Sequence, residues 1–225
     1  MTTLEAVPAT TVDPVRVSTR FGVAFAVCQL LVMVAMAVFV LPHGGSPSDP
    51  ALERGESVGA AADIYRIGNF VFMAAGSLLL GFLGAVHVRL RRADRTGTLA
   101  TVAVASGTLL AVIWPMAGML HDVALETAAA GTDPAILAGW DAVAPYSLAF
   151  SVFARIFFVG AIALALKAAG TAPWLVRAAG VIVVLSLVGG ATLISGVLFP
   201  LLALSTLAYE VWVGALAWHW LRRDR

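Results

Sequence analysis

Six apolar runs, each about as long as a bilayer is thick, limit what this chain can fold into. A helix needs about 20 apolar residues to cross a hydrocarbon core of about 30 Å. The runs cover residues 21–41, 67–88, 99–120, 145–166, 175–198 and 201–221. Of the 225 residues, 60% are hydrophobic and only 12% are charged, whereas about a quarter of a soluble domain is charged. The sequence therefore predicts an all-α polytopic membrane protein, a bundle of six transmembrane helices surrounded by the lipid bilayer.

The segments between these runs are polar or rich in glycine and proline. Residues 1–20 lack apolar periodicity and predict a disordered cytoplasmic tail, and residues 222–225 form a short basic tail. Residues 42–63 predict a water-exposed loop, and residues 121–143 a second acidic loop with a short surface helix around 135–139. Residues 175–221 are too long for one crossing at 1.5 Å per residue, so the chain should turn near Gly196 and Pro200.

Basic residues predict the orientation. Eleven of them lie in the N-terminal tail, after the second and fourth runs and at the C-terminus, whereas Arg54 and Arg66 lie on the opposite side. By the positive-inside rule, both termini are cytoplasmic. Arginine outnumbers lysine thirteen to one, which together with abundant Ala, Gly and Val is typical of a GC-rich bacterial genome. We therefore expect a multi-pass protein of the bacterial cytoplasmic membrane.

Two charged residues lie deep inside apolar runs, Arg155 in the fourth and Glu210 in the sixth, at nearly the same depth, whereas Arg177 lies at the edge of the fifth run. A charge at the bilayer centre costs about 3 kcal/mol or more, so such residues face the bundle interior and pair. Ser151 shares a face with Arg155, and Thr206 shares one with Glu210. Three alternatives remain open: a structural ion pair, a proton or substrate site, or two charges that never meet.

Further polar positions join this candidate core. Asn69, the only asparagine, shares a helical face with His87 in the second run and should look toward the bundle interior. Pro115 removes the hydrogen bond to the carbonyl of Ala111 and should kink the third run.

The four histidines allow a rival function. His43 and His121 fall at the outer boundary and His87 and His219 near the inner one. This depth pattern would suit axial ligation of haem in a membrane redox protein. A third alternative is a membrane enzyme that acts on lipid through His121 and nearby acids.

Other classes of function lack support. A single cysteine, Cys28, makes neither a disulfide nor a cysteine-based metal site. Net charge is +1, and no basic stripe predicts a nucleic-acid partner. No metalloprotease, phosphate-loop or serine-hydrolase motif is present, so we assign no catalytic residue, no metal and no cofactor beyond the haem alternative.

Three short motifs carry a resemblance: Arg66-Ile-Gly-Asn69, Ala154-Arg155-Ile156 and the Trp-ended tail with Arg222 and Arg223. In these the chain resembles small six-span integral membrane proteins of GC-rich bacteria, a group that brings no activity to carry over. The leading hypothesis is non-enzymatic: a carrier of a small solute or proton, or a membrane partner subunit that forms a homo- or hetero-oligomer. The sequence does not identify the small-molecule substrate.

Overall fold

A computed structural model describes residues 13–40, 49–129 and 133–224, and its regular elements in these ranges are helices. In chain order they are α1 Pro14–Ala35 with a π-helical turn Met36–Val40, α2 Ala51–Ala60, α3 Ala62–Ala93, α4 Thr98–Ala129, α5 Pro134–Asp141, α6 Val143–Phe150, α7 Val152–Ala168, α8 Pro173–Gly190, two 3₁₀ turns Ala191–Leu193 and Gly196–Leu198, and α9 Phe199–Arg223. The all-α prediction is confirmed. Residues 1–12 of the predicted disordered tail, 1–20, lie outside the described residues. His43 also lies outside them.

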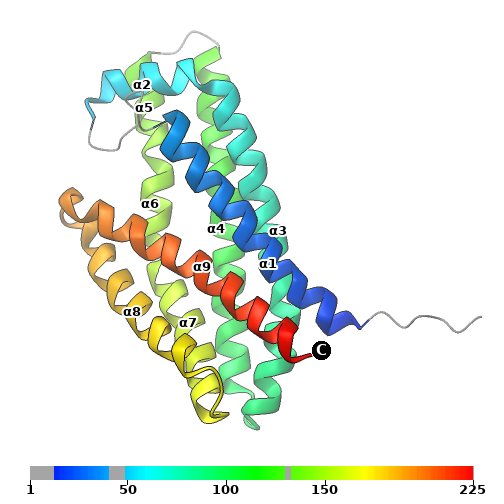
Figure 1. Cartoon of the computed structure of the whole chain (residues 1–225). Coiled ribbons are helices and arrows are strands. Elements are labelled where there is room, and N and C mark those ends of the chain that lie inside the picture. The colour runs from blue at the N-terminus through cyan, green and yellow to red at the C-terminus, as the bar shows by residue number, and fades with distance from the viewer. Residues whose placement is uncertain (1–12, 41–48, 130–132, 225) are drawn as a thin grey trace, which may run out of the picture.

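Six of these helices close a ring. Each packs on the next, in the order α1, α3, α4, α7, α8, α9, and α9 returns to α1 (Figure 1). The ring is filled by large buried side chains from several of its helices, among them Phe82, Phe158, Ile162, Tyr209 and Leu216. The polar residues of the bundle interior therefore lie where helices from both halves of the chain meet.

The two ends of the ring differ. One end, called here the basic end, holds the start of α1, the α3–α4 and α7–α8 turns and the end of α9 (Figure 1). The other, called here the capped end, is covered by α2 and α5, which pack on each other. Gly55 of α2 lies so close to α5 that a Cβ there would come within 1.9 Å of the Pro134 carbonyl oxygen.

The prediction of a plain loop at residues 42–63 was wrong, because residues 51–60 form α2. The expected surface helix near 135–139 is confirmed as α5. Val58 is fully buried together with Leu137 and Tyr65. A short amphipathic helix is marginal alone, and packing against a second element stabilises it. This partner is 80 residues away in sequence, which explains why the loop composition concealed α2.

Five helical segments among the described residues are long and apolar enough to cross a membrane: Pro14–Phe39, Ala62–Ala93, Thr98–Thr127, Pro173–Leu193 and Gly196–Arg223. The predicted run 145–166 differs because it is divided at Ser151 into α6 and α7, neither of which reaches that length by itself. The Ser151 hydroxyl donates to the Leu148 carbonyl at 2.7 Å, and such local bonds bend helices. Helical backbone hydrogen bonds nevertheless continue across the division, because the Ser151 amide donates to the Ser147 carbonyl and the Arg155 amide donates to the Ser151 carbonyl.

Helix α1 begins seven residues before the predicted start of the first span, so residues 14–20 are helical and not a disordered tail. Asp13 accepts a hydrogen bond from the Val15 amide at 2.9 Å and Pro14 occupies the first helical position, the arrangement that favours a helix start. Ser18 then joins α3, accepting from the Ala85 amide at 2.7 Å. This tertiary contact extends the helix beyond its apolar run.

Pro115 lies inside α4, which continues to Ala129. The carbonyl of Ala111, which proline leaves without its helical donor, faces Gly76 of α3. A Cβ on Gly76 would lie 2.5 Å from that oxygen and 2.5 Å from Pro115 Cγ. The pair of residues thus lets α3 and α4 approach closely.

Candidate functional site

Arg155 lies in the sealed interior of the ring, 1% exposed. It is in the first turn of α7, directly after the division from α6. Its two terminal nitrogens donate to serine hydroxyls, Nη1 to Ser205 Oγ and Nη2 to Ser151 Oγ, each at 2.9 Å. These hydroxyls donate in turn to backbone carbonyls of Leu202 and Leu148. The guanidinium charge is therefore solvated by a relay of serine hydroxyls.

Glu210 is also 1% exposed, so the structure places both predicted charges inside the bundle. They are near enough for their charges to interact. However, no ion pair within 4 Å joins Arg155 to Glu210 in the described residues, whereas such pairs join Arg66 to Asp63 and Glu126, and Arg89 to Asp224. Arg155 and Glu210 share an interior without direct contact, and Glu210 Oε2 has no hydrogen-bond partner among the described residues.

Tyr209 lies beside both groups. The Arg155 guanidinium carbon is 5.6 Å from the Tyr209 ring centroid, a separation at which a cation is attracted to the ring face. The ring is held edge-on by Phe25 of α1 and Phe158 of α7. Its buried hydroxyl has no hydrogen-bond partner in the described part of the chain, so a further polar group joins the cluster.

Gln29 of α1 was not among the predicted site residues, and the structure buries it to 1% exposure. Helices α1 and α9 run antiparallel (Figure 1), and a Cβ on Gly214 would lie 2.7 Å from Ala26 Cβ. Gln29 lies about one helical turn after Ala26, and Glu210 lies about one turn before Gly214. Because the two helices are antiparallel, Gln29 and Glu210 are at the same level of the bundle. Both amide atoms of Gln29 lack hydrogen-bond partners among the described residues. The sequence signal was its position as the only glutamine of the chain, inside an apolar run.

Ser186 of α8 approaches the cluster from the other side. A Cβ on Gly189 would lie 2.7 Å from the Leu202 backbone, and one turn along the α8–α9 hairpin this register sets Ser186 level with Ser205. Ser186 is fully buried and its hydroxyl is also unpartnered in the described residues. We call Gln29, Ser151, Arg155, Ser186, Ser205, Tyr209 and Glu210 the interior cluster.

Three other predicted site residues are not in the interior cluster. Thr206 is buried but its hydroxyl donates to the Leu202 carbonyl of its own helix at 2.9 Å. Asn69 is 4% exposed but faces α4, where its Nδ2 donates to Asp122 Oδ1 at 2.7 Å. His87 is exposed. The prediction that Asn69 and His87 turn toward Arg155 was wrong, because α3 presents that face to α4 and to the exterior.

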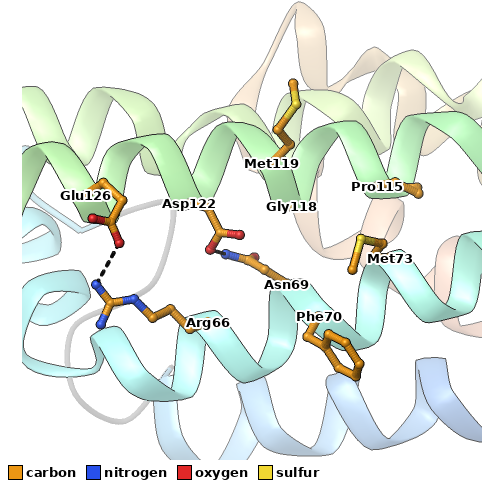
Figure 2. Close-up of a pocket in the computed structure, with 9 residues that line it drawn as sticks. All are labelled: Arg66, Asn69, Phe70, Met73, Pro115, Gly118, Met119, Asp122 and Glu126. Atoms are coloured by element: carbon orange, nitrogen blue, oxygen red, sulfur yellow. Dashed lines mark hydrogen bonds and ion pairs between the residues drawn. The ribbon is translucent and has the colours of Figure 1, made fainter.

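Asn69 instead belongs to a cavity of about 480 Å³ between the halves of α3 and α4 nearest the capped end. Figure 2 shows charged groups along one part of it and apolar side chains, Phe70, Met73, Pro115 and Met119, along the other. Phe70, Met73 and Met119 are more than half exposed, so the cavity opens sideways from the ring.

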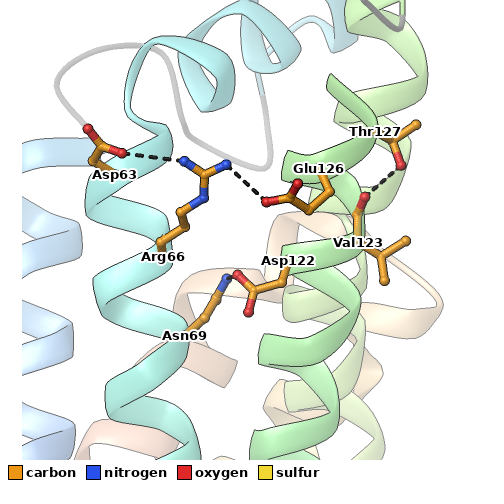
Figure 3. Close-up of polar contacts among 7 residues, drawn as sticks. All are labelled: Asp63, Arg66, Asn69, Asp122, Val123, Glu126 and Thr127. Carbon is orange, nitrogen blue, oxygen red and sulfur yellow. Dashed lines mark hydrogen bonds and ion pairs between the residues drawn. The ribbon is translucent and has the colours of Figure 1, made fainter. Parts of the chain in front are cut away.

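The charged part joins α3 to α4. Arg66 contacts Glu126 at 3.1 Å and Asp63 at 3.5 Å (Figure 3). Asp122 has the Asn69 amide as its partner but no basic group within ion-pair distance in the described residues. Acids thus outnumber bases here, and the cavity suits a small amphiphile with a positively charged head.

The three described histidines differ in how far their side chains are buried. His121 is buried with its ring 5.1 Å from Tyr65, edge-on, His87 is exposed and His219 is partly buried. No group of three or more His, Cys, Asp or Glu residues that could hold a metal is present in the residues that the structure describes.

These features define a class: an all-helical protein in which six helices, five of them long and apolar enough to cross a membrane, close a ring around a buried polar cluster. Comparisons with protein-family models, with curated proteins and with solved structures found no match to this chain.

Proposed function

We propose that this chain is a six-pass carrier of the bacterial cytoplasmic membrane, with both termini cytoplasmic, in which Glu210 binds and releases a proton during transport of a small solute. The sixth crossing is α6 with α7, which together connect the capped end to the basic end. The basic end, which carries most of the arginines, faces the cytoplasm on this proposal.

The observation that carries the proposal is the unpartnered state of the interior cluster. Polar atoms of Gln29, Ser186, Tyr209 and Glu210, together with Arg155 Nε, are buried without hydrogen-bond partners among the described residues. Each such atom costs about 1–3 kcal/mol if it stays unsatisfied. A cluster kept only for stability would pair its groups, whereas a site that exchanges protons or holds a polar solute leaves groups ready for it. Ionisable residues inside a membrane are typical of such pathways.

Glu210 is the group that can carry the proton, because it is the only carboxylate within the six apolar runs. Arg155 lies near it as a permanent charge, since guanidinium does not lose its proton in proteins. The burial of both residues, each 1% exposed, corresponds to an occluded state of a carrier.

The α3–α4 cavity supplies a place for the solute. Asp122 offers an uncompensated carboxylate to an ammonium group, and Met73, Pro115 and Met119 offer an adaptable apolar wall to an alkyl chain. On this proposal, the solute is an alkylammonium ion.

The test is proton flux into vesicles that contain the purified full chain and a trapped pH-sensitive dye. Glu210→Gln should lower the flux about tenfold or more, because glutamine has no titratable proton. Glu53→Gln, which removes an exposed acid of α2, should leave the flux unchanged. Thermal unfolding of each variant in detergent separates loss of function from loss of fold, and Glu210→Asp should retain part of the flux.

The same vesicles test the solute. Octyltrimethylammonium should accelerate proton exchange, and Asp122→Asn should require about tenfold more of it, because the asparagine removes the coulombic attraction between the carboxylate and the quaternary ammonium. The proposal fails if wild-type vesicles exchange protons no faster than protein-free vesicles, or if Glu210→Gln leaves the flux unchanged.

A further inference from the structure

A second cavity, of about 190 Å³, lies at the basic end between the start of α1 and the end of α9. It is lined by three arginines and two apolar side chains: Arg16, Arg20, Trp218, Leu221 and Arg222. The residues from α1 and those from α9 are 198 or more positions apart in sequence, so only closure of the ring between α1 and α9 brings them together. None of them takes part in the interior cluster.

The three arginines have no acidic partner in the part of the chain that the structure describes. The ion pairs of the described residues do not include Arg16, Arg20 or Arg222, and Arg16 Nε is buried without a hydrogen-bond partner there. The two nearest acids in sequence bond other groups, since Asp13 accepts from the Val15 amide and Asp224 accepts from Arg89. Three positive charges that converge on one hollow repel one another unless an anion joins them.

The apolar side of the cavity indicates where this anion comes from. Trp218 is 47% exposed, and the Arg222 guanidinium carbon lies 5.1 Å from its ring centroid. Tryptophan is enriched at helix ends that lie at the level of the lipid headgroups, because its ring has both apolar and polar parts. Leu221 extends the same wall. An anion that reaches this site from the bilayer carries its own alkyl chains past Trp218 and Leu221.

We propose that Arg16, Arg20 and Arg222 bind the phosphate of an anionic phospholipid of the leaflet at the basic end, with the lipid chains lying along Trp218 and Leu221. Guanidinium groups recognise phosphate through paired, charge-assisted hydrogen bonds. Such a lipid joins the first and last helices of the ring and stabilises its closure. This inference is independent of proton movement at Glu210.

The experiment titrates the purified full chain in maltoside micelles with didecanoyl phosphatidylglycerol and counts bound lipids by native mass spectrometry. The matched lipid is didecanoyl phosphatidylcholine. Wild type should hold one phosphatidylglycerol more tightly than the rest and show no such preference for phosphatidylcholine. The triple variant Arg16→Gln, Arg20→Gln, Arg222→Gln should bind that lipid about tenfold or more weakly, because each charged hydrogen bond contributes about 1.5–3 kcal/mol.

The matched control removes the same number of charges from the same end. Arg91, Arg92 and Arg95 are exposed at the end of α3 and beyond it, so Arg91→Gln, Arg92→Gln, Arg95→Gln should keep the wild-type affinity. If the first triple variant does not fold, Arg20→Gln alone, at an exposed position, should weaken binding by a smaller factor.

Two outcomes overturn the proposal. Equal losses in both triple variants would mean that general attraction to a positive surface suffices. Displacement of the bound lipid by millimolar inorganic phosphate would assign the cavity to a soluble anion instead of a lipid.

Discussion

At the scale of single residues, the partners of Arg155 decide what its burial means. A carboxylate partner would have made a buried ion pair, in which loss of either group is costly. The structure provides hydroxyls, with Ser151 and Ser205 each accepting one guanidinium hydrogen bond. The stability of the buried guanidinium therefore depends on two serine hydroxyls, Ser151 and Ser205, and not on an ion pair.

Ser205→Ala should destabilise the protein by about 1–3 kcal/mol, since it leaves a buried charged donor without its acceptor. Ser77→Ala is the matched control, because the exposed Ser77 hydroxyl bonds only the Met73 carbonyl of its own helix. Glu210→Gln should cost less than Ser205→Ala, as no ion pair is broken. Thermal unfolding in detergent measures all three, and a larger cost for Glu210→Gln would show that the two charges pair after all.

At the scale of elements, the seam between α3 and α4 is formed around a proline and a glycine. Pro115 frees the carbonyl of Ala111, and Gly76 allows α3 to pass over it at close range. Small residues at such crossings let helix backbones approach, which is the main source of packing between helices in lipid. The solute cavity lies on the same seam, since Pro115 is part of its wall.

Gly76→Ala should therefore destabilise the protein by about 1–3 kcal/mol, the usual cost of overpacking. Gly68→Ala on the same helix is the matched control, because a Cβ there meets nothing within 4 Å. It should stabilise by about 0.5–1 kcal/mol, the cost of glycine in a helix interior. Unfolding midpoints of the two variants should move in opposite directions, and a shift of both in one direction would contradict the described seam.

Considered as a whole molecule, the described part of the chain has both of its ends, the start of α1 and the end of α9, at the basic end (Figure 1). Closure of the ring between α1 and α9 explains this arrangement, since adjacent antiparallel helices at the two chain ends place both described ends together. Closure of the ring also creates the cavity lined by Arg16, Arg20 and Arg222, which neither helix forms alone.

Labelling of single cysteines with a membrane-impermeant maleimide tests the six-pass topology in intact cells. In a Cys28→Ser background, Ala135→Cys of α5 should react, because the capped end faces outward on the proposed orientation. Thr96→Cys and Thr171→Cys, in the turns of the basic end, should react only after the membrane is permeabilised. Reaction of Thr171→Cys in intact cells would mean that α6 and α7 do not cross.

Much of the architecture follows from the amino-acid sequence. Five of the six apolar runs appear as helices long enough to cross a membrane, and the chain turns near Gly196 and Pro200 as predicted. The burial of Arg155 and Glu210 was also predictable. These features depend on local composition and helical period, which any stretch of chain expresses by itself.

Tertiary structure alone decided which polar groups meet. Asn69 bonds Asp122 and not the interior, Arg155 bonds serines and not Glu210, and Gln29 enters the cluster because α1 packs on α9. The helical period tells which residues of one helix share a face, but not which neighbour that face meets. The close approaches at Gly76, Gly189 and Gly214 restrict how α3, α8 and α9 rotate against their neighbours, and they depend on residues of other helices.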